Sequence, residues 1–203
     1  MSQRPSAPVD VLALGELDGG TLGNDGTFRV FLDELRREAP ATTVRVFGYG
    51  THRLADALGV EETTMNAARS RTGGILGAVA KVTARLRDFP RTAGHVRRSR
   101  IVVIPGTGLF EGDHGTSFVG WPLAFWRTAM SCRLHRRPLL VLGVGASDVR
   151  EGMSRRLLRS GLRAAQVVTC RDQHSVDVLR GWLGSAAPVL LTADMVFARD
   201  DEA

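Results

Sequence analysis

The stretch at residues 9–28, "VDVLALGELDGGTLGNDGTF", decides the fold class of this chain. Its first seven residues are a short apolar run that predicts a buried strand. It leads into residues 27–39, where apolar side chains repeat at the spacing of a helix face. Between the two elements the chain places five glycines: Gly15, Gly19, Gly20, Gly23 and Gly26. Because glycine lets backbone approach a ligand closely, the stretch predicts a strand, one wall of a cleft and then a helix.

The same alternation of strand and helix continues along the chain. Five more apolar runs predict strands at residues 42–48, 101–106, 138–145, 166–172 and 188–194. Helical spacing predicts helices at residues 51–58, 74–89, 122–136, 154–165 and 173–184. Residues 90–100 have the composition of a basic connector, and residues 59–73 follow neither pattern. This order predicts an α/β fold with a Rossmann-like parallel sheet of about six strands and helices on both faces.

The length of 203 residues is enough for one α/β domain with a core and short for two. We expect residues 1–8, which are polar with two prolines, to form a flexible arm, and residues 9–203 to form a single domain. There is no signal-peptide pattern and no apolar run of about 18–20 residues. Two cysteines give neither a disulfide framework nor a metal spacing. These features predict a cytoplasmic protein.

The chain is basic, with a net charge of +6 at pH 7, and nearly all of its 27 basic residues are arginine. A basic protein attracts anions, which include nucleic acid, acidic lipid and phosphorylated small molecules. Nucleic-acid binding would favour aromatic side chains among the arginines of residues 85–100, or a known binding module. The sequence has neither, so we expect no nucleic-acid partner and read these arginines as a solvated face.

In an open parallel sheet, ligands bind beyond the carboxyl ends of the strands. Five predicted strands end in glycine and acidic residues, with the sequences "GELDGGTLGND", "PGTGLFEGDHG", "GVGASD", "CRDQHS" and "TAD". Neither G-x-G-x-x-G after the first strand nor G-x-x-x-x-G-K-[ST] is present, so nicotinamide cofactors and P-loop chemistry lose support. The clustering of these residues at five strand ends predicts a polar site at one edge of the sheet.

Some of these side chains have both a structural and a chemical reading. Asp25 is either a general base or a helix N-cap. Arg171 either binds an anion or forms an ion pair with Asp172. The pattern favours Asp172 as the N-cap of the helix that follows it, with Ser175 forming a local hydrogen bond. Asp194 follows a strand, where a carboxylate must face the cleft or solvent, and this favours a functional role.

Other candidates have weaker patterns. One group of three residues could shape an acceptor site or bind a metal: Glu111, Asp113 and His114. These residues are too close together in the sequence and lack a distant fourth ligand, so we expect no metal. We favour a solvated loop for this stretch. The apolar side chains of residues 121–134 favour core packing over contact with a membrane or a lipid-linked acceptor. Three scattered histidines are read as surface residues: His52, His95 and His135.

Five short motifs, taken together, resemble the polysaccharide pyruvyl transferase family. They are "TLGND" (21–25), "VVIPGTGLFE" (102–111), "VLGVGAS" (141–147), "RDQHS" (171–175) and "DMVF" (194–197). Their order and spacing match over residues 9–198, although Thr21 stands where the family usually has asparagine. The resemblance implies one lobe, the N-terminal one, of a two-lobed glycosyltransferase-B-like fold, with the second lobe absent from this chain.

The resemblance also implies an enzyme that moves a pyruvyl group from phosphoenolpyruvate to a saccharide or glycan precursor in cell-surface polysaccharide biosynthesis. No cofactor is implied beyond this donor substrate. Read with the strand ends, it makes Asp25 and Asp194 the catalytic candidates. The substrate-binding candidates are Thr21, Gly23, Asn24, Gly106, Thr107, Gly108, Glu111, Gly145, Arg171, Asp172 and Ser175.

The implied partners are a saccharide or lipid-linked glycan acceptor and either a second-lobe chain or further copies of this chain. Membrane contact would be peripheral at most. Two alternative functions stay open. One is a non-catalytic lobe that binds a saccharide or an anion and needs a partner chain. The other is a lobe like that of a nucleotide-sugar glycosyltransferase, which shares the fold.

Overall fold

The computed structural model describes residues 9–16, 22–49, 52–65, 88–106, 108, 110–112, 118, 120–150, 152–185 and 187–198. The predicted arm at residues 1–8 lies outside this part of the chain, as does nearly all of the predicted helix at residues 74–89. Four candidate site residues also lie outside it: Thr21, Thr107, Asp113 and His114.

Seven parallel strands form one sheet in the order β3-β2-β1-β4-β5-β6-β7. This confirms the predicted Rossmann-like parallel sheet and adds β3 to the strands that the sequence predicts. β3 has the polar sequence "EETT" and lies at the edge of the sheet, where side chains stay partly exposed, so it lacks the apolar run of a central strand. The strands are β1 (Val9–Glu16), β2 (Val44–Tyr49), β3 (Glu61–Thr64), β4 (Ser99–Pro105), β5 (Leu139–Val144), β6 (Val167–Cys170) and β7 (Val189–Leu191).

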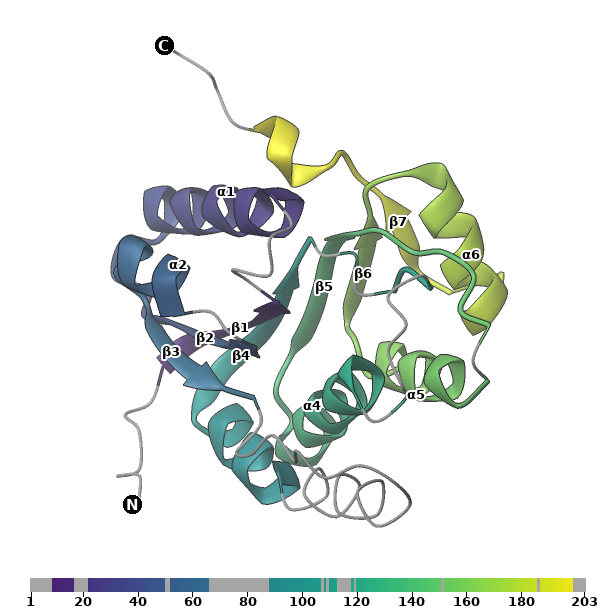
Figure 1. Ribbon diagram of the computed structural model, residues 1–203, viewed down its shortest axis with the longest axis horizontal. Helices are drawn as coiled ribbons and strands as arrows, with labels where there is room; N and C mark the ends of the chain where they lie inside the picture. The colour runs from purple at the N-terminus through teal and green to yellow at the C-terminus, as the bar shows by residue number, and fades with distance from the viewer. Residues whose placement is uncertain are drawn as a thin grey trace.

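Helices cover both faces of the sheet, as predicted (Figure 1). α1 and α2 lie on one side, and α4 and α5 lie on the other with the teal helix of residues 88–97. The bounds are α1 (Leu22–Glu38), α2 (His52–Leu58), α4 (Trp121–His135), α5 (Gly152–Leu162), α6 (Gln173–Leu183) and the 3₁₀ helix η1 (Met195–Ala198).

The predicted connector at residues 90–100 is wrong, because residues 88–97 are helical. The buried side of this helix carries Asp88, Thr92 and His95 beside Val96. Since three of these four buried residues are polar, the helix has no apolar periodicity that the sequence could reveal. α1 also begins five residues before the predicted start, so Gly23 lies within its first turn rather than in a loop.

The core follows the alternation of side chains along the strands. Leu12 and Leu14 of β1 belong to the larger apolar cluster, which includes residues of α4, α5 and α6. Ala13, between them, belongs to a smaller cluster with Phe28 and Leu32 of α1.

Most apolar residues of α4 serve the core, as the sequence favours, but Leu134 near the end of the helix is 66% exposed. Phe125 is fully buried, and its ring meets the ring of Phe110 edge-on with 5.3 Å between the centroids. Gly161 of α5 lies against the Phe125 ring and leaves no room for a side chain of its own. Among the helices in the described part of the chain, none has both the length and the apolar content to cross a membrane.

A buried ion pair joins α4 to the helix at residues 88–97. Arg127 is 1% exposed, and its Nη1 lies 3.7 Å from Oδ2 of Asp88. Its Nη2 donates a hydrogen bond of 3.1 Å to the carbonyl oxygen of Met65, just after β3. The arginine therefore connects three segments that are far apart in the sequence.

The prediction of a surface histidine is wrong for His95, which is 9% exposed and packs its ring against Phe47. Burial lowers the pKa of His95 from 6.5 to about 4, and the charges of Arg45, Arg91 and Arg98 contribute to the decrease. Within the part of the chain that the structure describes, Nδ1 of His95 has no hydrogen-bond partner. The folded protein therefore holds this ring neutral at pH values where the unfolded chain would protonate it.

This difference predicts a pH-dependent stability. As the pH falls below 6.5, the unfolded chain takes up a proton on His95, whereas the folded protein takes it up only near pH 4. The free energy of unfolding should therefore decrease by at most ~3 kcal/mol over this range. Urea unfolding of the wild type and of His95→Phe at several pH values checks this, since the variant keeps a ring that does not titrate. Equal pH dependence in the two proteins would contradict the prediction.

Candidate active site

The strand order reverses between β1 and β4, and in folds of this kind ligands bind beyond the carboxyl ends of the strands at such a point. Gly106 follows β4 here with φ of +23°. A Cβ at Gly106 would overlap the side chain of Thr27 in α1 and approach the Met195 side chain of η1. Only glycine fits, and its small size lets the start of α1, the end of β4 and η1 meet.

Arg171 lies directly after β6 and is surrounded by three carboxylates. Its Nη2 donates a hydrogen bond of 2.7 Å to Oε1 of Glu111, which comes from the loop after β4. Its Nη1 lies 3.7 Å from Oδ2 of Asp194, which follows β7, and its Nε lies 3.6 Å from Oδ2 of Asp172. We call Arg171, Glu111, Asp172 and Asp194 the Arg171 cluster.

Backbone contacts hold the loops that carry this cluster. Phe110 pairs with Ala146 in a parallel bridge, and the backbone N–H of Gly112 donates to Oγ of Ser147 at 2.6 Å. The backbone of Gly145 lies under the cluster, because a Cβ there would overlap both the Glu111 carboxylate and the Arg171 guanidinium. The ion pair between those two side chains thus depends on a glycine at the end of β5.

Asp172 is the N-cap of α6, which confirms the structural reading from the sequence. Its Oδ1 accepts a hydrogen bond of 2.7 Å from the backbone N–H of Ser175. Partial burial raises the pKa of Asp172, but hydrogen bonds from Ser175 and the charges of Arg171 and His174 outweigh burial and lower it. The side chain of Ser175 is buried, and its Oγ accepts a hydrogen bond of 2.9 Å from the N–H of Ala146, so it supports the loop after β5.

The other candidates are spread around the same edge of the sheet. Gly23, Asn24 and Asp25 lie in the first turn of α1, so Asp25 is inside the helix and is not its N-cap. Gly108 lies beside the Glu111 carboxylate, which a Cβ at this position would meet at 2.8 Å. α1 packs against η1, which directly follows Asp194, so the segments that carry the two catalytic candidates are neighbours. None of these placements tests substrate binding, which stays a prediction for every candidate.

Two features of the site are not apparent from the sequence. The first is the ion pair between Glu111 and Arg171, because the sequence offers Glu111 as a candidate but gives it no partner. The second is Met195, whose side chain lies near both Gly106 and Gly143. Both arise from contacts between loops of different strands, and no local spacing encodes such contacts.

The cluster carries one positive and three negative charges when all four side chains are ionised. A net charge of −2 favours a ligand that donates hydrogen bonds, because carboxylates are acceptors only. A sugar, with its many hydroxyl groups, is such a ligand. An anion would have to compete with the carboxylates for Arg171, which is already paired.

No set of three or more His, Cys, Asp or Glu side chains within the described residues is arranged to hold a metal ion. Both cysteines are buried and unpaired. Burial raises the pKa of Cys132 to about 12 and that of Cys170 to about 11, with the Asp172 charge adding to the latter. Since the thiolate is the reactive form, neither thiol is suited to act as a nucleophile at neutral pH.

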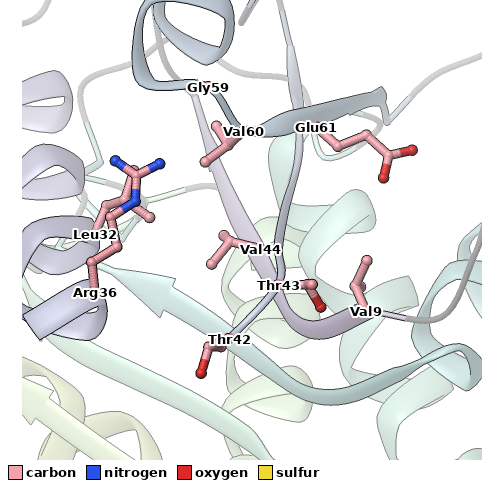
Figure 2. A pocket seen from close by; sticks show the side chains of 9 residues that line it. All are labelled: Val9, Leu32, Arg36, Thr42, Thr43, Val44, Gly59, Val60 and Glu61. Atoms are coloured by element: carbon pink, nitrogen blue, oxygen red, sulfur yellow. The ribbon is translucent and has the colours of Figure 1, made fainter. Parts of the chain in front are cut away.

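Two hollows lie at the opposite edge of the sheet, where the strands begin. Figure 2 shows one of them, in which the aliphatic side chains of Leu32, Val44 and Val60 lie between Arg36 and Glu61. Arg36 belongs to α1 and donates a hydrogen bond of 2.6 Å to the carbonyl oxygen of Leu58. These hollows are distant from the Arg171 cluster. The Arg171 cluster is the candidate active site, because chemistry-bearing side chains from several strands meet there.

The fold defines the class of the protein as a Rossmann-like lobe of the glycosyltransferase-B type. Residues 78–203, more than half of the chain, match the sequence profile of a family described as "Polysaccharide pyruvyl transferase". The chain therefore belongs to the polysaccharide pyruvyl transferase family. The matched range includes the motifs at 102–111, 141–147, 171–175 and 194–197 and excludes the one at 21–25.

A solved structure shows the same fold. A protein described as a UDP-N-acetylglucosamine 2-epimerase from Listeria monocytogenes aligns with a TM-score of 0.53 and 11% identity, over 90% of this chain and 44% of that chain. MurG of Acinetobacter baumannii aligns with a TM-score of 0.49 and 12% identity, over 91% of this chain and 45% of that one. This chain thus spans less than half the length of either structure. Comparison with curated proteins gives no match.

Proposed function

We propose that this chain is the acceptor-binding lobe of a transferase that moves a pyruvyl group from phosphoenolpyruvate to a saccharide or glycan precursor. The observation that carries the proposal is the Arg171 cluster, in which side chains from three strand ends meet at the carboxyl edge of the sheet. Membership of the family supports the type of reaction. Since phosphoenolpyruvate is an intracellular metabolite, the proposal places the reaction in the cytoplasm and the product in cell-surface polysaccharide biosynthesis.

The proposed reaction forms a ketal. A proton adds to the methylene carbon of phosphoenolpyruvate, and one sugar hydroxyl adds to the neighbouring carbon. A second hydroxyl then displaces phosphate from that carbon. One of the two hydroxyl protons returns to the acid that protonated the methylene carbon, and the other leaves with phosphate. The reaction therefore needs a base for the hydroxyls and an acid for the carbon.

Asp194 is the proposed base. Its side chain is 23% exposed, so a sugar hydroxyl can reach it, and its Oδ2 lies 3.7 Å from Nη1 of Arg171. Glu111, which pairs with Nη2 of the same guanidinium, would accept a hydrogen bond from another hydroxyl and so orient the sugar ring. Asp25 is the second acid/base candidate, at the start of the helix that packs against η1.

The charge of the cluster bears on where the donor binds. Phosphoenolpyruvate carries a carboxylate and a phosphate, and a site with a net charge of −2 would repel it. The proposal therefore has the donor held largely by a second lobe, which a continuation of this chain, a partner chain or another copy would supply.

The proposal is tested by incubating the purified protein with phosphoenolpyruvate and a panel of saccharides. We expect release of inorganic phosphate that depends on both substrates, with the pyruvate ketal detected by mass spectrometry. Turnover of a nucleotide sugar with no reaction of phosphoenolpyruvate would favour the nucleotide-sugar transferase instead. Saccharide binding without turnover, in the presence of every lobe of the native protein, would favour the non-catalytic reading.

A further inference from the structure

The second hollow at the amino edge of the sheet is lined by four arginines. We call it the basic hollow, and its volume is about 510 Å³. It lies where β1 and β4 begin, so the length of β4 separates it from the Arg171 cluster by roughly 20 Å. The proposed pyruvyl transfer makes no use of it. Its lining residues are Val9, Asp10, Thr43, Arg97, Arg98, Ser99, Arg100 and Arg137.

Asp10 is the one acidic residue among those that line the basic hollow. Its carboxylate accepts hydrogen bonds from the backbone N–H and the Oγ1 of Thr43, at 3.1 and 2.9 Å. These bonds, with a smaller effect of the Arg100 charge, lower the pKa of Asp10. Asp10 is thus ionised at neutral pH, and the four arginines and one aspartate give the hollow a net charge of +3.

Some of this positive charge has a structural use. Helix carboxyl ends favour cations, and the helix at residues 88–97 and α4 both end near this edge. Nη2 of Arg137 donates a hydrogen bond of 2.9 Å to the carbonyl oxygen of Arg97. Nη1 of Arg100 lies 3.3 Å from Oδ1 of Asp10, although its side chain is 82% exposed. These two contacts account for only part of the donor capacity of the four guanidinium groups.

Among the described residues, the side chains of Arg97 and Arg98 do not form structural contacts of this kind. Within the part of the chain that the structure describes, neither side chain makes a hydrogen bond or an ion pair. Both arginines line the hollow, and the Arg98 side chain lies along the preceding helix, with Nη1 3.8 Å from where a Cβ of Gly94 would be. Each guanidinium is a planar fork of N–H donors, and like charges gathered at one hollow favour the binding of an anion. Phosphate oxygens match the geometry of this fork in pairs.

We propose that the basic hollow binds a phosphate group, with Arg97 and Arg98 as the principal donors and Arg100 as a third. The phosphate group belongs either to a soluble phosphate compound or to the headgroup of an anionic lipid. This site is independent of the proposed transferase activity, because it lies at the other edge of the sheet and shares no residue with the Arg171 cluster.

The test uses the full 203-residue chain and two probes. Inorganic pyrophosphate, titrated by calorimetry, represents a soluble ligand. Phosphatidylcholine vesicles with and without phosphatidylglycerol, in a sedimentation assay, represent a lipid surface. The test variant is Arg97→Gln/Arg98→Gln. The control is Arg155→Gln/Arg156→Gln, which removes the same charge from an adjacent pair of exposed arginines on α5.

We expect the wild type and the control to bind one of the two probes, and the test variant to bind it at least about tenfold more weakly. Binding of pyrophosphate identifies a soluble source, and binding that requires phosphatidylglycerol vesicles identifies a lipid source. The proposal is overturned if neither probe binds the wild type. It is also overturned if the two double variants lose affinity equally, because the attraction would then come from net charge. Thermal unfolding of all three proteins verifies that each is folded.

Discussion

Replacing the buried Arg127 with methionine is expected to lower the free energy of unfolding by about 3–5 kcal/mol. The substitution removes the cation that faces the Asp88 carboxylate, which is itself 3% exposed, and leaves a charge in the interior. It also removes the hydrogen bond to the carbonyl oxygen of Met65. Urea unfolding followed by circular dichroism measures the effect.

Arg133→Met is the matched control, because Arg133 lies on the same helix with its side chain exposed. We expect this variant to stay within about 0.5 kcal/mol of the wild type. If Arg127→Met proved as stable as the control, the buried ion pair would not hold α4 to the helix at residues 88–97. The role that we assign to Arg127 would then be wrong.

The second large effect is expected on catalysis. Asp194→Asn keeps the shape of the side chain but removes the negative charge that would accept a proton from the sugar hydroxyl. If Asp194 is the base, phosphate release from phosphoenolpyruvate should slow by roughly 10²–10⁴-fold in a preparation that turns over. The fold should be retained, since the side chain is partly exposed and its ion pair with Arg171 is long, at 3.7 Å.

Asp33→Asn is the control for this experiment, because Asp33 is an exposed residue of α1. A full rate of phosphate release by Asp194→Asn would exclude Asp194 as the base and leave Asp25 as the remaining candidate. Loss of saccharide affinity with an unchanged turnover number would instead assign Asp194 to acceptor binding.

The central strands could be predicted because they are buried on both faces, which requires continuous apolar sequence such as "IVVIPG" at residues 101–106. The same reasoning fails where burial is partial or polar. β3 is an edge strand of sequence "EETT", and the helix at residues 88–97 buries Asp88 and His95 among its core contacts. Neither element has the apolar pattern on which a sequence-based prediction depends.

The candidate site also has a part that the sequence could predict and a part that it could not. The residues after each predicted strand were identifiable as site candidates, because the carboxyl ends of parallel strands meet at one edge. Which of them touch could not be predicted. Arg171 had Asp172 as its expected partner, but its shortest ion pair is with Glu111, sixty positions earlier in the chain.

The fold class, the family and the edge of the sheet where the chemistry is expected could all be inferred from the amino-acid sequence, because each depends on local patterns and their order. Three features became visible only in the folded chain: the grouping of Arg171 with Glu111 and Asp194, the burial of Arg127 and His95, and the two unpaired arginines of the basic hollow. These depend on distances between segments that are remote in the sequence. Strand order and loop packing set those distances, and no single stretch of sequence encodes them.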